Sequence, residues 1–292
     1  MRRATPGGAR SMRLLAVIGW AMLGGGAHAQ VVQHRDAPTL PVELFEFPGN
    51  RVKVWVEATG SLKTTDMRPD EGVSIQDALK QLPAIADLGR RELLLVSGGR
   101  AGSRTDLPDG LLKSNGRLSS STNLTKLRGS PAEDCALRRA DRYRLSGLLC
   151  VRKDSGAVSI GKVTADIAGL AACEHAIQSG PLLVEEGKPA VCDRDPSEVR
   201  STYSVFCTRA DGTLAVAVAR KPVAIDELAK WLAEPRPAGA DCQSAMALNV
   251  GKASGAVYTG PKSFQVVARK PRYSGPGTVS VPSFVVIQPL GN

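Results

Sequence analysis

The stretch from residue 241 to residue 255, DCQSAMALNVGKASG, has the form of an active-site loop. A cysteine precedes the apolar run from Ala245 to Leu248, and a polar turn with two glycines follows it. An apolar run of this length predicts a buried strand that delivers the turn to a surface, where glycine lets the backbone approach a ligand closely. We therefore expect this stretch to lie at the centre of a functional site.

The histidines and carboxylates limit the chemistry that such a site could perform. After residue 29 the chain contains only His34 and His175, and His175 is the plausible titrating histidine. A Ser-His-Asp arrangement built from Ser179 and His175 lacks the sequence pattern of a nucleophile elbow. Hydrolysis by a carboxylate pair needs two acids that face the cleaved bond, and spacing selects no pair among the available acids: Asp106, Asp109, Glu174 and Asp241.

The first 29 residues have the features of a secretory signal peptide. Four arginines precede an apolar run from Leu14 to Leu23, and Ala27-His28-Ala29 supplies small residues before a cleavage site at Gln30. Cleavage would leave 292 − 29 = 263 residues, of which residues 30–40 are predicted to be a flexible lead-in. No apolar stretch reaches the roughly 20 residues of a membrane-spanning helix, so we expect no membrane span and a periplasmic or secreted protein.

Charge and cysteine content narrow the possible partners. The formal net charge is +10, and the basic residues form no run and do not alternate with aromatics, which argues against nucleic-acid binding. An even number of cysteines in an exported chain favours disulfides, with several pairings open. We predict that Cys207 pairs with Cys242, because both lie on predicted core strands. The absence of a CxxC pair or a cysteine–histidine cluster predicts no metal site and no cofactor.

The elements that must position the loop alternate between strands and helices. Two hairpins are predicted, one joining residues 42–47 to 51–58 and one joining 203–208 to 213–219. The apolar run from Glu92 to Val96 predicts a strand buried on both faces. Amphipathic patterns predict helices at residues 74–88, 164–172 and 224–233.

An arginine-rich segment at residues 130–150 is predicted to be an exposed insertion, which a disulfide between Cys135 and Cys150 could close. Apart from this insertion, residues 41–292 are expected to form a single large domain. Hairpins with interspersed helices predict an α+β fold that has a mixed, largely antiparallel sheet.

Four short motifs, each next to a predicted element, occur in a fixed order along the chain. They are Ser97-Gly98-Gly99 followed by Gly110-Leu111-Leu112 and Asn115-Gly116, then Gln178-Ser179-Gly180-Pro181 with a Gly187-Lys188 turn, then Arg200-Ser201, then Leu248 to Ser254. Because these motifs occur in this order, the chain from about Glu92 to Val286 resembles the phosphodiester glycosidase domain family. That secreted family includes the enzyme that removes N-acetylglucosamine from its phosphodiester link to mannose, and many bacterial exopolysaccharide-associated proteins.

The resemblance implies a reaction and a set of site residues. The reaction would be hydrolysis of a sugar-1-phosphodiester, with the developing charge stabilised by donors in a preformed pocket. His175 would serve as general acid or base, and Asn249 stands where the family carries an aspartate. Arg200 and Gln178 would contact the phosphate. The substrate-binding residues implied in this way are Ser97, Gly98, Gly99, Gln178, Ser179, Gly180, Arg200, Gly251 and Ser254.

The departures from the family motifs leave two functions open. Ser97 replaces an asparagine, Asn249 an aspartate, Val250 a glycine and Ala253 a serine. Asparagine cannot ionise, so it neither acts as a carboxylate base nor holds a divalent cation with comparable strength. The chain is therefore expected to be either an exported hydrolase of sugar phosphodiesters, with activity impaired by these changes, or a non-catalytic glycan-binding protein. In both cases its partner is a carbohydrate or a sugar-phosphate polymer.

Overall fold

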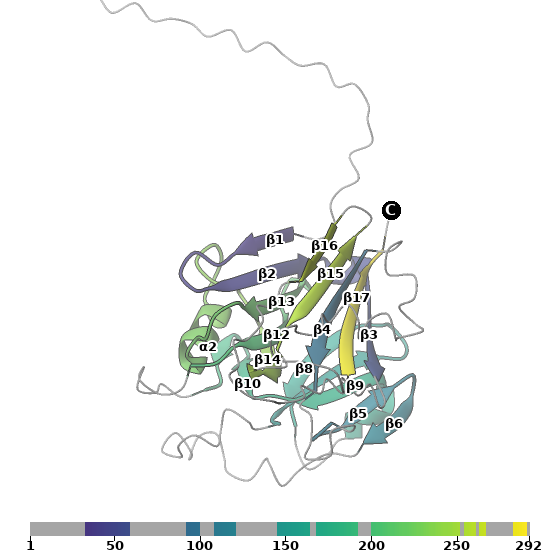
Figure 1. The fold of residues 1–292 in the computed structure, drawn as a ribbon. Coiled ribbons are helices and arrows are strands. Elements are labelled where there is room, and N and C mark those ends of the chain that lie inside the picture. Colours follow the sequence, from purple (N-terminus) through teal and green to yellow (C-terminus); the bar gives the residue numbers. More distant parts are fainter. Residues whose placement is uncertain are drawn as a thin grey trace, which may run out of the picture.

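Short apolar runs in this sequence form three antiparallel sheets that pack around a common core (Figure 1). The computed structural model describes residues 33–58, 92–99, 108–120, 145–163, 168–191, 200–251, 254–260, 263–266 and 283–290. In these ranges the chain is largely β, in one domain. No helix among these residues is long and apolar enough to cross a membrane.

The seven-stranded sheet carries the helix. Its strand order is β1 (Gln33–Asp36), β2 (Val42–Phe47), β13 (Leu214–Ala219), β12 (Tyr203–Thr208), β14 (Ser244–Val250), β10 (Leu182–Glu185) and β11 (Lys188–Pro189). Helix α2 (Ile225–Ala233) buries Leu228, Trp231 and Leu232 in one hydrophobic cluster with residues of this sheet. Asp226 and Glu227 lie in its first turn, where the partial positive charge of the helix end favours them.

Two five-stranded sheets complete the fold. The β4 sheet has the order β16 (Ser263–Val266), β15 (Ala256–Gly260), β4 (Leu93–Gly98), β17 (Ser283–Pro289) and β3 (Val52–Ala58). The β9 sheet has the order β6 (Arg117–Ser120), β5 (Leu112–Ser114), β9 (Cys173–Ser179), β7 (Gly147–Arg152) and β8 (Val158–Lys162). The main core takes Phe206 and Met246 from the seven-stranded sheet, Leu94 from the β4 sheet, and Leu149 and Ile177 from the β9 sheet.

Several predictions from sequence are confirmed. Strands β12 and β13 form the second predicted hairpin, with Ser204 opposite Val218 and Thr208 opposite Leu214. Every residue of β4 is buried, as expected for a strand covered on both faces. Cys207 and Cys242 form the predicted disulfide, with their Cα atoms 5.8 Å apart. The predicted helix at residues 224–233 is α2, which ends before Pro235.

The first predicted hairpin is wrong. Strands β2 and β3 lie in different sheets, where β2 pairs with β1 and β13, and β3 pairs with β17. A 3-10 helix at Gly49–Arg51 turns the chain from one sheet to the other. A Cβ on Gly49 would come 2.1 Å from the Gly212 carbonyl oxygen, so glycine lets this turn pack on the β12–β13 turn. Both strands turn apolar side chains toward the main core, Phe45 and Phe47 from β2 and Val54 and Val56 from β3, and this shared burial does not name a pairing partner.

The predicted insertion at 130–150 and the flexible lead-in at 30–40 also need correction. Residues from Gly147 onward form β7, an interior strand of the β9 sheet in which Leu149 is fully buried. Cys150 on this strand pairs with Cys173 rather than closing an exposed loop with Cys135. Within the lead-in, Gln33–Asp36 is strand β1. The arginines before β7 made the whole segment look exposed, although β7 itself is apolar. Strand β1 has only four residues, which is too short for a clear periodic pattern.

The predicted α+β class holds only in part. All strand pairings in the described ranges are antiparallel, so no mixed sheet is found there. The predicted helix at 164–172 contains a 3-10 helix at Ala168–Ala172, and residues 164–167 lie outside the described ranges. The predicted helix at 74–88, the signal peptide at 1–29 and most of the segment 130–150 also lie outside them.

Candidate functional site

Ends of strands from all three sheets meet at a junction that we call the seam, which consists of residues of β4, β9, β12, β14 and β17 (Ser97–Gly99, Ser179, Ser204, Leu248–Asn249 and Ser283). The Ser179 hydroxyl at the end of β9 donates a hydrogen bond to the Leu248 carbonyl oxygen at 2.8 Å. The Asn249 Nδ2 group near the end of β14 donates to the Gly99 carbonyl oxygen, just after β4, at 3.2 Å. The first, second and last sequence motifs are therefore brought together in space.

Buried serines complete the hydrogen-bond network of the seam. The Ser97 and Ser204 hydroxyl oxygens lie 3.3 Å apart, and the Ser97 hydroxyl also donates to the Gly255 carbonyl oxygen at 3.1 Å. The Ser283 hydroxyl donates to the Gly98 carbonyl oxygen at 2.8 Å. Ser97, Ser204 and Ser283 are fully buried, and buried hydroxyls need such partners. Sequence reasoning missed Ser204 and Ser283, although each is a serine set against an apolar strand.

The Asn249 side chain makes two hydrogen bonds, one through its amide nitrogen and one through its amide oxygen. Its Nδ2 group donates to the Gly99 carbonyl oxygen, while its Oδ1 atom accepts from the Val250 backbone N–H at 2.9 Å. An aspartate could keep the second bond but not the first, because a carboxylate has no proton to donate. In this chain Asn249 therefore clamps the end of β14 to the turn after β4.

Two glycines make the close approach of these strands possible. A Cβ on Gly98 would lie 3.1 Å from Ile177 Cδ1, and one on Gly99 would lie 3.1 Å from the Ser283 hydroxyl oxygen. Gly99 also has φ +70°, a conformation that side chains other than glycine rarely adopt. Both glycines are therefore needed for packing at the seam, whatever its chemistry.

Gln178 points away from the seam although its neighbour Ser179 belongs to it. Successive side chains of a strand face opposite sides, so β9 places these two residues on different faces. The Gln178 Oε1 atom accepts from the Leu111 N–H at 3.1 Å, and its Nε2 group donates to the Leu145 carbonyl oxygen at 2.9 Å. Gln178 is fully buried and ties β9 to the two segments beside it. Gly180 is also buried and links β9 to β10 in the seven-stranded sheet.

The loop after β14 begins at the edge of the seam. The Gly251 N–H donates to the Thr202 carbonyl oxygen at 2.8 Å, and Gly251 has φ +77°. The Ser254 hydroxyl oxygen lies 2.8 Å from Thr202 Oγ1 and 2.6 Å from the Gly251 carbonyl oxygen. Gly251 and Ser254 are thus tied to the start of β12. Thr202 was not identified from sequence.

Arg200 lies outside the seam. Its guanidinium is exposed and contacts the Glu227 carboxylate at 2.8 Å, in the first turn of α2. The isolated bridge between Ser201 and Val223 holds this segment beside the helix. Arg200 is therefore close in sequence to Thr202, which contacts the loop after β14, but its charge is directed toward α2.

His175 lies at the other end of β9, four residues and roughly 13 Å along the strand from Ser179. Its Nδ1 atom accepts a hydrogen bond from the Asn115 N–H at 3.2 Å. Burial lowers the pKa of His175, and it outweighs the Glu174 carboxylate and the hydrogen bond with the Val56 carbonyl, which both raise the pKa. The charge of Lys53 lowers the pKa a little further. The imidazole is thus neutral and engaged in local structure, and it is not brought to Asn249.

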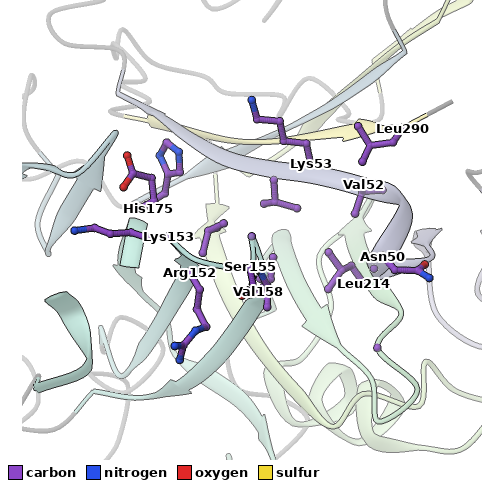
Figure 2. A pocket seen from close by; sticks show the side chains of 17 residues that line it. Asn50, Val52, Lys53, Arg152, Lys153, Ser155, Val158, His175, Leu214 and Leu290 are labelled. Carbon is purple, nitrogen blue, oxygen red and sulfur yellow. Dashed lines mark hydrogen bonds between the residues drawn. The ribbon is translucent and has the colours of Figure 1, made fainter. Parts of the chain in front are cut away.

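A pocket of about 720 Å³ opens beside His175 (Figure 2). It lies where the start of β3 meets the turn between β7 and β8 and the turn between β12 and β13. We call it the His175 pocket. Along β17, the strand that pairs with both β3 and β4, Gln288 is opposite Lys53 of the pocket and Ser283 is opposite Gly98 of the seam. The two sites are therefore at opposite ends of the β4 sheet.

The four candidate carboxylates do not converge. Asp109 lies between Pro108, which is near Gly99, and Gly110, which is near Gln178. Glu174 lines the His175 pocket, and Asp241 contacts Arg236 at 3.4 Å. Asp106 lies outside the described residues. Among the described side chains, no group of three or more His, Cys, Asp or Glu could hold a metal ion.

A comparison with known protein families matches the part of the chain that carries the four sequence motifs. The sequence matches the phosphodiester glycosidase family over residues 92–288. A comparison with curated protein sequences found no match.

Two solved structures have a similar fold. One is the catalytic domain of zebrafish N-acetylglucosamine-1-phosphodiester alpha-N-acetylglucosaminidase, auto-inhibited by its pro-peptide, with a TM-score of 0.50 and 14% identity over 91% of this chain and 85% of that chain. The other is a hypothetical protein from Synechocystis, with a TM-score of 0.51 and 12% identity over 88% of this chain and 62% of that chain. At these identities the likeness concerns the fold. Because the family match spans more than half of the sequence, the chain belongs to the phosphodiester glycosidase family.

Proposed function

We propose that this protein is an exported phosphodiester glycosidase that acts on sugar-1-phosphodiester links in glycans or envelope polymers. The observation that carries the proposal is the seam. Motifs some 150 residues apart along the chain meet there through the 3.2 Å hydrogen bond from Asn249 to Gly99. The substrate would lie against this junction and the loop that begins at Gly251.

Export rests on the first 29 residues and on the cysteines. The N-terminal arginines, apolar run and small residues have the order of a signal peptide. The described part of the chain has the disulfides Cys150–Cys173 and Cys207–Cys242, and such bonds persist in oxidising compartments outside the cytoplasm. A periplasmic or secreted location would bring the protein to envelope glycans.

A second function, glycan binding without hydrolysis, is favoured by the state of Asn249. Both ends of its side chain are used in hydrogen bonds to the backbone, and it cannot ionise. The Ser97 hydroxyl is likewise buried and partnered. On this reading the seam keeps the architecture of a hydrolase site while its polar groups serve to hold the strands together.

One experiment separates the two functions. The mature protein is incubated with the methyl diester of N-acetylglucosamine 1-phosphate, and released sugar is measured by chromatography while binding is measured by calorimetry. The variants are Asn249→Ala, Asn249→Asp and the double variant Ser97→Asn with Asn249→Asp, and the last two restore family residues. Asn50→Asp, an exposed site away from the seam, is the matched control for the added charge.

Release of sugar by the wild-type protein, unchanged in Asn50→Asp and lost in Asn249→Ala, supports the hydrolase. Binding without release by the wild-type protein, together with release by the double variant, supports the binding protein. If the diester neither binds to nor is cleaved by the wild type and the double variant, both functions fail for this substrate class.

A further inference from the structure

Thr202 contacts both ends of the loop after β14. It lies directly before β12, and its carbonyl oxygen accepts a hydrogen bond from the Gly251 N–H at 2.8 Å. This contact extends the pairing of β12 with β14 by one residue beyond the pair of Tyr203 and Val250. Gly251 then leaves the strand with φ +77°, a conformation that favours glycine. The direction in which the loop departs is therefore set beside Thr202.

The Thr202 hydroxyl belongs to a small cluster of oxygens at the other end of the loop. Its Oγ1 atom lies 2.9 Å from the Gly251 carbonyl oxygen and 2.8 Å from the Ser254 hydroxyl oxygen. The Ser254 hydroxyl oxygen lies 2.6 Å from the same carbonyl oxygen, which also accepts the Ser254 N–H at 3.0 Å. The two hydroxyls have only two protons for these three oxygen–oxygen contacts, so both protons are used inside the cluster.

The chain on both sides of Thr202 is anchored to other parts of the domain. On one side, the Ser201 N–H donates to the Val223 carbonyl oxygen at 3.0 Å, and the Val223 N–H donates back at 2.8 Å, just before α2. On the other side, Ser204 lies in the seam, with its hydroxyl oxygen 3.3 Å from that of Ser97. Thr202 therefore offers the loop a fixed support.

We infer that Thr202 is a positioning residue of the proposed glycosidase site, which keeps Gly251 and Ser254 in the positions from which they contact the sugar phosphodiester. The inference rests on the proposed function, in which the substrate lies against the seam and this loop. Gly251 and Ser254 are partly exposed, whereas the polar side chains of the seam are buried. A support of this kind fixes binding groups before the ligand arrives, which lowers the ordering cost of binding.

The main test is Thr202→Val, which keeps the shape of the side chain and the backbone carbonyl but removes the hydroxyl. Hydrogen–deuterium exchange at the Gly251 and Ser254 amides should become about tenfold faster, because the cluster loses one of its two protons. The affinity of the mature protein for the methyl diester of N-acetylglucosamine 1-phosphate, measured by calorimetry, should fall by about tenfold.

Three further variants identify the hydroxyl as the cause. Thr202→Ser keeps the hydroxyl and should behave as the wild type in both measurements. Thr208→Val is the matched control, because it makes the same change at the other end of β12 and should alter neither quantity. Ser254→Ala removes the partner hydroxyl and should reproduce both effects of Thr202→Val, and combining the two should add little. Thermal unfolding shows that each variant is folded.

Faster exchange and weaker binding in Thr202→Val, with recovery in Thr202→Ser, would support the inference. Exchange or affinity unchanged in Thr202→Val would overturn it, as would equal effects of Thr208→Val or no recovery in Thr202→Ser. The wild-type protein tests the proposed function separately. If the wild type neither binds nor cleaves the diester, the proposed function fails and the inference fails with it.

Discussion

The seam and the His175 pocket are two junctions of the same three sheets, and they differ in how they treat polar groups. At the seam, buried hydroxyls and the Asn249 amide find partners within the protein. At the pocket, residues from all three sheets line an open volume, and Lys53, Arg152, Lys153 and Glu174 are among them. One strand, β9, contributes Ser179 to the first and His175 to the second. Two residues four positions apart on one strand can therefore belong to different sites.

The comparison can be tested most strongly by removing the disulfide next to the pocket lining, Cys150–Cys173, and the one at the far end of β14 from the seam, Cys207–Cys242. Replacing Cys207 and Cys242 by alanine, or Cys150 and Cys173 by alanine, should each lower the free energy of unfolding by about 3 to 4 kcal/mol, because the unfolded chain gains freedom. Urea denaturation measures both losses. The second pair should also disturb the His175 pocket, because Cys150 and Cys173 are next to Val151 and Glu174 of its lining. A loss below about 1 kcal/mol for either pair would contradict this expectation.

A smaller difference is expected between two glycines with nearly the same backbone conformation. Gly99 in the seam has φ +70°, and Gly156 beside the pocket has φ +67°. Substitution by alanine strains both, at about 1 to 2 kcal/mol each. Gly99→Ala should cost about 1 to 3 kcal/mol more, because its Cβ would lie 3.1 Å from the Ser283 hydroxyl oxygen while Gly156 has open space. Equal losses in thermal unfolding would show that the seam is less tightly packed than described.

The Asn249 clamp should be measurable in stability as well as in activity. Asn249→Asp removes the donor to the Gly99 carbonyl oxygen and turns a carboxylate toward it, so we expect a loss of about 1 to 3 kcal/mol at neutral pH. Asn50→Asp, which adds the same charge at an exposed position, should change stability by less than about 0.5 kcal/mol. Denaturant unfolding of the two variants makes the comparison. Unchanged stability in Asn249→Asp would mean that the amide does not clamp the strands.

The smallest expected effect is a pH dependence that belongs to the pocket side alone. Since the pKa of folded His175 lies below its usual 6.5, the unfolded state takes up the proton first as the pH falls. The contribution of a neutral His175 is therefore complete above pH 6.5 and is progressively lost below it. Unfolding at pH 8 and pH 5 should show this loss in the wild type and not in His175→Gln, whose amide oxygen can still accept from Asn115. An equal pH dependence in both proteins would assign the effect to other groups.

Much of the fold was predictable from local patterns. Continuous apolar runs identified β4 and β14, an Asp-Gly turn identified the β12–β13 hairpin, and periodic apolar residues ending at Pro235 identified α2. The order of the motifs also predicted the family, and the family match over residues 92–288 confirms it. These features depend on neighbours within a few residues, which is the range over which sequence patterns act.

Pairing and placement were not predictable in the same way. The alternating strands β2 and β3 would satisfy a hairpin, yet they pair in different sheets because strand partners are chosen by the packing of the whole core. Gln178 and Ser179 share a motif, but the pleat of β9 sends them to opposite faces. No local pattern decides which face of β9 meets the seam.

The sequence by itself therefore determined the identity of most strands and the absence of an ionisable group at position 249, since each of these is a property of residue type and local order. The tertiary structure decided that Ser179 meets Leu248 and Asn249 meets Gly99. It also decided that His175 and Arg200 lie elsewhere. The physical reason is geometric. Four residues along a β-strand span roughly 13 Å, whereas sheet packing brings residues 150 positions apart into hydrogen-bond contact.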